Sequence, residues 1–195
     1  NAASRITVEL IKGMLNATRR EMEALITRTA MSPFIREKKD FFPAILNPAG
    51  ELVVSTSLTL AGNLVDAILQ QYPADTMQDG DLFWYNDPYA TGGAVSHLPD
   101  MVFVMPVFAE NRLLAFIECW GHLWDIGGAV PGSISPTASS VFQEGVMIPP
   151  VRVLHGGVRN EEVVRIFTRN SRFPDMLEGD LNSLMAACNL GCKRL

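Results

Sequence analysis

The feature that most constrains the fold is a pair of apolar runs, "MVFVMPVF" at residues 101–108 and "RLLAFIECW" at residues 112–120, joined through the short polar segment "AENR". Short apolar runs bounded by turn-forming residues are typical of buried strands, and a connection this short joins antiparallel neighbours. The sequence therefore predicts a hairpin at the centre of a sheet. The residues before its first strand and after its second strand then lie side by side.

The remaining segments predict several helices and further short strands. Residues 6–30 carry apolar side chains at helical spacing and end at Ser32-Pro33, which predicts an amphipathic helix. Strands and helices interleave without a regular alternation, so we expect an α+β fold: a mixed or antiparallel sheet packed by several helices. The other predicted elements are two strands around the turn "NPAG" in residues 41–54, a helix in residues 62–72, a strand at Leu82–Tyr85, and helices at 160–170 and 174–195 punctuated by Pro174 and Gly179.

Composition limits the class of protein. The chain has 195 residues, of which 48% are hydrophobic, and this is enough for one substantial core. Its apolar runs reach only about eight or nine residues, roughly half a membrane span. A net charge of −5 with scattered basic residues argues against non-specific nucleic-acid binding. Three cysteines do not suggest a disulfide framework, so we expect a soluble protein of the reducing cytoplasm.

Two of the three histidines flank the predicted hairpin. His97 precedes the first strand and His122 follows the second, so the two imidazoles are expected to face a common point. Asp100, three residues after His97, reaches the same point if Leu98-Pro99 form a turn. Two imidazoles and one carboxylate form a set that holds Zn, Mn or Fe while leaving coordination positions free. Asp125 is a candidate to orient His122 through a hydrogen bond.

Other interpretations of these residues stay open. A His-x-x-Asp pair also occurs as an ordinary surface hydrogen bond, and spacing alone does not exclude that. No serine stands in a G-x-S-x-G elbow, which argues against serine hydrolysis. Neither Gly92-Gly93 nor Gly127-Gly128 leads into a phosphate-binding loop, which argues against nucleotide binding. Cys188 and Cys192, one helical turn apart, are expected to be apolar helix residues rather than metal ligands.

Several segments together resemble the hydantoinase B/oxoprolinase family. They are "RTAMSPFIREKKDFFPAIL", "NDPY…GG…SHLPDM", "GHLWDIGGAVPGS", "FQEGVMIPPVRV" and "NSRFPDMLEGDLNSLMAAC", in the family's order and near its spacing. The resemblance covers essentially the whole sequence. Chains of this family usually have several hundred residues, so the resemblance implies that residues 1–195 are the N-terminal, metal-bearing portion of such a chain.

The resemblance also implies a chemistry. The family includes parts of N-methylhydantoinase, 5-oxoprolinase, a caprolactamase, and acetone and acetophenone carboxylases. In these enzymes a hydantoinase A-type partner binds ATP, with Mg, and phosphorylates a carbonyl oxygen. The B-type part holds a divalent metal through a His-x-x-Asp and a later histidine, which correspond here to His97, Asp100 and His122. Asp40 stands where some members supply a further aspartate ligand.

Departures from the family surround this site. The family often has two adjacent histidines where this chain has His122 and Leu123, and "LTLAGNL" at Leu58–Leu64 lacks the histidines of the usual segment. Ala94 and Val95 lengthen the glycine turn. We therefore expect an ATP-dependent hydrolase of cyclic amides, of hydantoin, 5-oxoproline or lactam type. The alternatives are a ketone carboxylase subunit and a non-catalytic domain whose histidines are structural.

Overall fold

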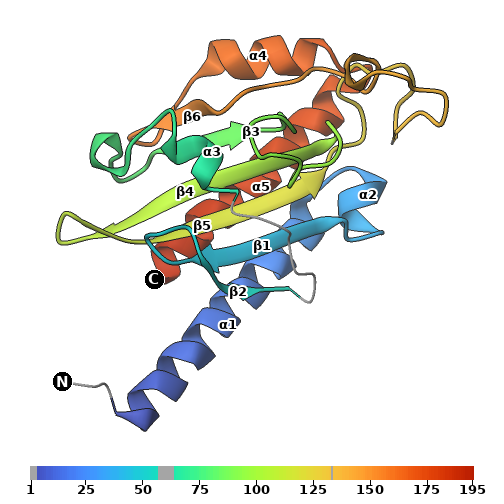
Figure 1. Ribbon diagram of the computed structural model, residues 1–195. Helices are drawn as coiled ribbons and strands as arrows, with labels where there is room; N and C mark the ends of the chain where they lie inside the picture. The colour runs from blue at the N-terminus through green and yellow to red at the C-terminus, as the bar shows by residue number, and fades with distance from the viewer. Residues whose placement is uncertain (1–3, 57–63, 133) are drawn as a thin grey trace.

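The computed structural model describes residues 4–56, 64–132 and 134–195. Within them the chain forms a seven-stranded antiparallel sheet in the order β2-β1-β5-β4-β3-β6-β7, packed by helices (Figure 1). The strands are β1 (Phe41–Leu46), β2 (Leu52–Ser55), β3 (Leu82–Tyr85), β4 (Asp100–Ala109), β5 (Arg112–His122), β6 (Val151–His155) and β7 (Val158–Arg159). The helices are α1 (Arg5–Thr29), α2 (Pro33–Arg36), α3 (Asp66–Leu69), α4 (Glu161–Arg169) and α5 (Pro174–Arg194), with 3-10 turns η1 (Ala74–Thr76) and η2 (Val141–Gln143). The predicted α+β class is confirmed.

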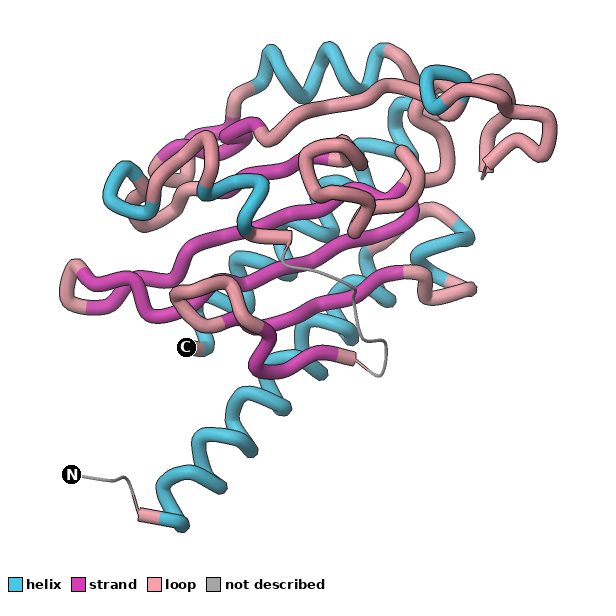
Figure 2. Tube along the Cα trace, in the orientation of Figure 1, coloured by secondary structure: helices cyan, strands magenta, loops and turns pink. Residues whose placement is uncertain are grey.

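The predicted central hairpin is confirmed. Strands β4 and β5 pair directly and occupy the middle of the sheet, with β1 beside β5 and β3 beside β4. Their register places Asp100 opposite His122 at the open end of the hairpin. The tube view in Figure 2 shows these long central strands between the shorter outer ones.

The two faces of the sheet carry separate hydrophobic clusters, because side chains alternate along each strand. Met101 and Phe103 of β4 pack with residues of α1 and α5 on one face. Val102 and Val104 face the opposite side, with residues of α3 and the loops around it. Figure 1 shows α5 crossing behind β4 and β5 while α3 lies on the front. Helices α1 and α5 therefore form one layer behind the sheet, and the shorter helix α3 covers part of its front.

Helix α1 confirms the amphipathic pattern. Ser4 caps it by accepting a hydrogen bond from the Thr7 N–H at 3.1 Å, and Met22 and Ile26 are buried in the core. The first turns extend beyond the sheet (Figure 1). The helix stops at Thr29, before Ser32 and Pro33, where the backbone becomes extended ahead of α2.

Gly179 was predicted to interrupt the C-terminal helix, and this is wrong. Helix α5 runs without a break from Pro174, which occupies its first turn, to Arg194. A Cβ atom at position 179 would overlap the sulfur of Met31. The glycine therefore permits the chain after α1 to approach α5 closely, rather than ending the helix. No described helix is long and apolar enough to cross a membrane.

The predicted helix at 62–72 is shorter than expected. Within the described residues 64–72, the α-helix is Asp66–Leu69, and no side chain caps its N-terminus. Residues 57–63, which include most of "LTLAGNL", lie outside the described part of the chain.

Candidate metal centre

Three potential ligands stand in one row across the sheet. Asp100 of β4 pairs with His122 of β5, and the His122 N–H donates to the Asp40 carbonyl, just before β1, at 2.9 Å. Two residues further into the strands, Phe42, Trp120 and Val102 form the next row. Because alternate residues share a face, the side chains of both rows lie on the face covered by α3. We call Asp40, His122 and Asp100 the metal row.

His97 completes a compact group with two members of this row. Its Nε2 atom lies 3.2 Å from His122 Nδ1 and 3.2 Å from Asp100 Oδ2. His122 Nδ1 lies 3.0 Å from Asp100 Oδ1. Among the described residues, these three are the group whose donor atoms lie close enough together, within 4.8 Å, to hold one ion. The convergence predicted from the hairpin is therefore present.

The spacing of these atoms fits a metal ion. Ligand atoms about 2.0–2.1 Å from a tetrahedral Zn²⁺ lie roughly 3.3 Å from one another. The observed separations of 3.0–3.2 Å are close to that edge length. Each atom offers a lone pair when the imidazoles are neutral and the carboxyl is ionised. The residues present thus match a two-imidazole, one-carboxylate site.

The charges around the group favour a cation. Burial acts to raise the pKa of Asp100, but hydrogen bonds with His122 and His97 outweigh it, so that pKa is lowered and the carboxylate stays ionised. The pKa of His97 is raised, first by its hydrogen bond with Asp100 and, against the effect of burial, by the negative charges of Asp100, Glu144 and Asp40. The site therefore has a negative potential.

Asp40 lies beside the group without joining it. One of its carboxylate oxygens pairs with Lys38 at 3.1 Å. Its charge nevertheless contributes to raising the pKa of His97, so the carboxylate lies near the site. The role of Asp40 as a ligand stays a prediction.

Asp125 ties two loops together. Its buried carboxylate accepts hydrogen bonds from the Arg172 backbone at 2.5 Å, the Arg172 guanidinium at 2.7 Å and the Ser171 hydroxyl at 3.3 Å. The predicted contact with His122 is not among the hydrogen bonds that the described residues make with Asp125. His122 Nε2 is buried, with no hydrogen-bond partner in the described part of the chain. Asp125 thus anchors the "WDIGG" loop to the start of α5.

Two residues that hold the His-x-x-Asp turn were not singled out from the sequence. Glu144 Oε2 accepts the Leu98 N–H at 2.9 Å, and Asn86 Nδ2 donates to the Leu98 carbonyl at 2.8 Å. Both stand in segments that carried the family resemblance, "FQEG" and "NDPY". Membership of these segments was the only indication in the sequence. Asn86 and Glu144 are 12 and 46 positions away from Leu98, and no local sequence pattern predicts a contact over such separations.

An apolar wall closes the inner side of the site. A cavity of about 20 Å³ touches Asp100, with room for about one water molecule. Ala94 and Val95, which the sequence predicts to lengthen the glycine turn, belong to this wall beside Asp100. The cavity is lined by Leu64, Ala94, Val95, Asp100, Val102 and Trp120.

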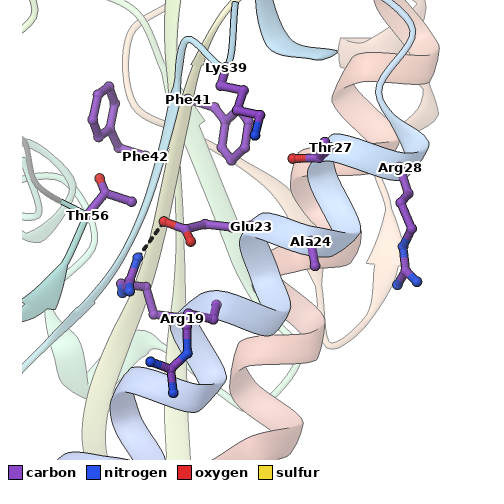
Figure 3. Close-up of a pocket in the computed structure, with 10 residues that line it drawn as sticks. Arg19, Glu23, Ala24, Thr27, Arg28, Lys39, Phe41, Phe42 and Thr56 are labelled. Atoms are coloured by element: carbon purple, nitrogen blue, oxygen red, sulfur yellow. Dashed lines mark hydrogen bonds and ion pairs between the residues drawn. The ribbon is translucent and has the colours of Figure 1, made fainter. Parts of the chain in front are cut away.

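A second hollow lies away from this group, between α1 and β1. It has a volume of about 940 Å³ and combines basic side chains with the rings of Phe41 and Phe42. Figure 3 shows Arg19 and Glu23, one turn apart on α1, paired at 2.5 Å, while Arg28 points away from them. None of the residues that line it belongs to the converging group.

The comparisons with known proteins place this geometry in a family. The sequence pattern of the hydantoinase B/oxoprolinase family matches residues 4–195. The chain belongs to the hydantoinase B/oxoprolinase family. It is 32% identical over 199 residues to the caprolactamase β subunit of Pseudomonas jessenii, covering 100% of this chain and 34% of that subunit. The family resemblance found in the sequence is thereby confirmed.

A solved structure and one further relative extend the comparison. The crystal structure of the ATP-dependent caprolactamase from Pseudomonas jessenii superimposes with a TM-score of 0.86 at 31% identity, covering 100% of this chain and 34% of that one. The acetophenone carboxylase δ subunit of Aromatoleum aromaticum is 31% identical over 149 residues, covering 74% of this chain and 21% of that subunit. This chain thus spans about a third of the caprolactamase β subunit.

Proposed function

We propose that this chain is the N-terminal, metal-bearing portion of an ATP-dependent hydrolase that opens cyclic amides. The observation that carries the proposal is the convergence of His97, Asp100 and His122 at the open end of the central hairpin. Similarity to a caprolactamase β subunit over the whole chain supports the substrate class. The relative's status as a subunit supports a partner of the hydantoinase A type, which would bind ATP with Mg.

The chemistry follows from the weakness of an unstrained amide as an electrophile. Phosphorylation of its oxygen by ATP in the partner turns that oxygen into part of a leaving group. A divalent metal, Zn, Mn or Fe, supplies a Lewis acid that polarises a carbonyl and makes water acidic at neutral pH. His97, Asp100 and His122 would hold it, and Asp40 would complete the set. The apolar wall beside Asp100 limits the water on the inner side.

A ketone carboxylase is the second candidate. Similarity to an acetophenone carboxylase δ subunit supports it, since that relative is 31% identical over 149 residues. The site would then orient an enolate and bicarbonate-derived CO₂ instead of an amide.

One assay separates these candidates. With the partner present, ATP turnover should rise at least about tenfold on adding a lactam without bicarbonate. Stimulation by a ketone only when bicarbonate is present would replace the hydrolase with the carboxylase. The His97→Ala variant should abolish either stimulation.

The metal site itself is tested without substrate. Purified protein should contain close to one equivalent of divalent metal by elemental analysis. His97→Ala and His122→Ala should each lose most of it, because each removes one of three converging donors. His155→Ala is the matched control, since this exposed histidine pairs with Asp81 outside the group. Unchanged metal content in the first two variants would support a non-catalytic domain with structural histidines.

A further inference from the structure

Both backbone polar groups of Leu98, the N–H and the carbonyl, are hydrogen-bonded to side chains. Leu98 is fully buried between His97 and Pro99, inside the turn that carries two of the three converging ligands. Its N–H donates to Glu144 Oε2 at 2.9 Å, and its carbonyl accepts from Asn86 Nδ2 at 2.8 Å. The orientation of this short turn therefore depends on two side chains from elsewhere in the chain.

Asn86 is a fixed anchor for one side. The residue is fully buried, its Oδ1 accepts the Ile148 N–H at 2.6 Å, and its Nδ2 donates to the carbonyls of Leu98 and Val146. Every donor hydrogen and the carbonyl oxygen of the side-chain amide are used. A buried amide satisfied in this way has one orientation available to it.

Glu144 is tied to the segment that follows the third ligand, His122. The flanking backbone groups bond to residues of "DIGGA", 125–129. The Ala129 N–H donates to the Gln143 carbonyl at 2.8 Å, and the Val146 N–H donates to the Ile126 carbonyl at 2.9 Å. Gly127 and Gly145 form a β-bridge between the two segments. Glu144 thus stands between the chain segments that carry His97, Asp100 and His122.

We propose that Glu144 is a positioning residue of the metal centre, which sets metal affinity by accepting the Leu98 N–H and so fixing the angle at which His97 and Asp100 present their donor atoms. The inference rests on the metal centre of the proposed function. Without this acceptor the buried Leu98 N–H loses its partner, and the turn must shift to find another. Groups that orient ligands from outside the coordination sphere typically change metal affinity about 10–100-fold when removed.

The test separates the hydrogen bond from the charge. Glu144→Gln keeps a side-chain oxygen at the same distance but removes the charge. Glu144→Asp keeps the charge but shortens the side chain by one methylene. Metal dissociation constants are measured by chelator competition, and the visible spectrum of the Co²⁺-loaded protein reports the ligand geometry. We expect Glu144→Gln to bind Zn²⁺ within about threefold of the wild type, and Glu144→Asp and Glu144→Ala to bind about 10–100-fold more weakly with altered Co²⁺ spectra.

Glu51→Ala is the matched control. It removes a carboxylate that bonds Asn47 in the β1–β2 turn, at the opposite end of β1 from the metal row, and should leave metal affinity unchanged. Thermal unfolding of the metal-free variants shows that each is folded. The opposite order, with aspartate binding normally and glutamine weakly, would mean that the charge of Glu144, and not its hydrogen bond to Leu98, sets the metal affinity, and would overturn the proposal. Wild-type affinity in Glu144→Ala would overturn it too. A wild-type protein that binds no metal would instead refute the proposed function.

Discussion

Glu118 is a buried acid that the proposed chemistry does not use. It lies on β5 in the same face as the metal row, between Ala44 and Val104 of the neighbouring strands, and its exposure is 1%. Burial alone raises the pKa of its carboxyl from 4.5 to about 8. Nearby, the Tyr85 hydroxyl donates to the Leu64 carbonyl at 2.6 Å, and the charges of Glu118 and Asp66 add to the effect of burial that raises the pKa of Tyr85. Glu118 is therefore protonated at neutral pH.

The raised pKa of Glu118 predicts a stability that falls as pH rises. Because the folded state holds this proton more tightly than the unfolded chain, the free energy of unfolding decreases between pH 4.5 and about 8. Glu118→Gln should remove this loss: stability close to that of the wild type at pH 4.5, and a gain on the order of 5 kcal/mol at pH 8.5. Urea unfolding at several pH values measures it. Glu110→Gln in the hairpin turn is the control, and an identical pH profile for Glu118→Gln would contradict the prediction.

The residues that sequence reasoning found and missed differ in how they are positioned. His97, Asp100 and His122 were predictable, because strand pairing in one hairpin brings them together and needs only local pattern. Glu144 and Asn86 were not, because they reach Leu98 through tertiary contacts between loops. Glu118 sits in a run that reads as an ordinary buried strand. Glu118 is neutral because other residues bury that face of the sheet, and local sequence patterns do not predict this burial.

At the scale of elements, the loops "DIGG" and "FQEG" each contain glycine because the other loop packs closely against it. The backbones of "DIGG" and "FQEG" cross so closely that a Cβ atom at Gly128 would overlap the Glu144 carbonyl oxygen. At Gly145, with φ +139°, a Cβ atom would also lie 2.6 Å from the Ile126 side chain. The glycines are therefore required by close approach of two loops, not by a phosphate site.

The close approach of these two loops predicts that Gly128→Ala lowers the free energy of unfolding. The added methyl group meets backbone, which cannot rotate away, so we expect a loss of about 1–3 kcal/mol in the free energy of unfolding. Gly13→Ala is the matched control, because it lies in helix α1 with no atom within 4 Å of the new methyl group. That change should stabilise the protein by about 0.5–1 kcal/mol. Urea unfolding compares the two, and equal effects would show that the loops can separate freely.

Regular elements were predictable to the extent that their signals are local. The hairpin and the helices α1, α4 and α5 follow apolar periodicity, and each is present near its predicted bounds. The Gly179 error arose because a glycine inside a helix has two causes, a helix end or a close neighbour. Only tertiary structure distinguishes them, and here the neighbour is Met31.

At the scale of the whole molecule, two buried cysteine side chains lie at the interface between the sheet and helix α5. Cys119 belongs to β5 and Cys188 to α5, and both are fully buried in the core cluster. Burial raises the pKa of Cys188, and contact with Cys119 adds to the effect. Because both thiols are buried, we expect them to react slowly in the folded state. They become accessible only when α5 separates from the sheet.

Burial at this interface predicts that Cys119 and Cys188 are labelled only when the whole protein unfolds. In a Cys192→Ala variant, which removes the half-buried third thiol, a disulfide reagent should label Cys119 and Cys188 at least about a thousandfold more slowly than the unfolded chain. The labelling rate should rise with urea along the same slope as the unfolding equilibrium, because α1, α5 and the sheet share one core. Fast labelling without urea would show that α5 detaches locally. In that case α5 would unfold independently of the sheet, and the positions of Asp40, His122 and Asp100 would depend on the sheet and not on α5.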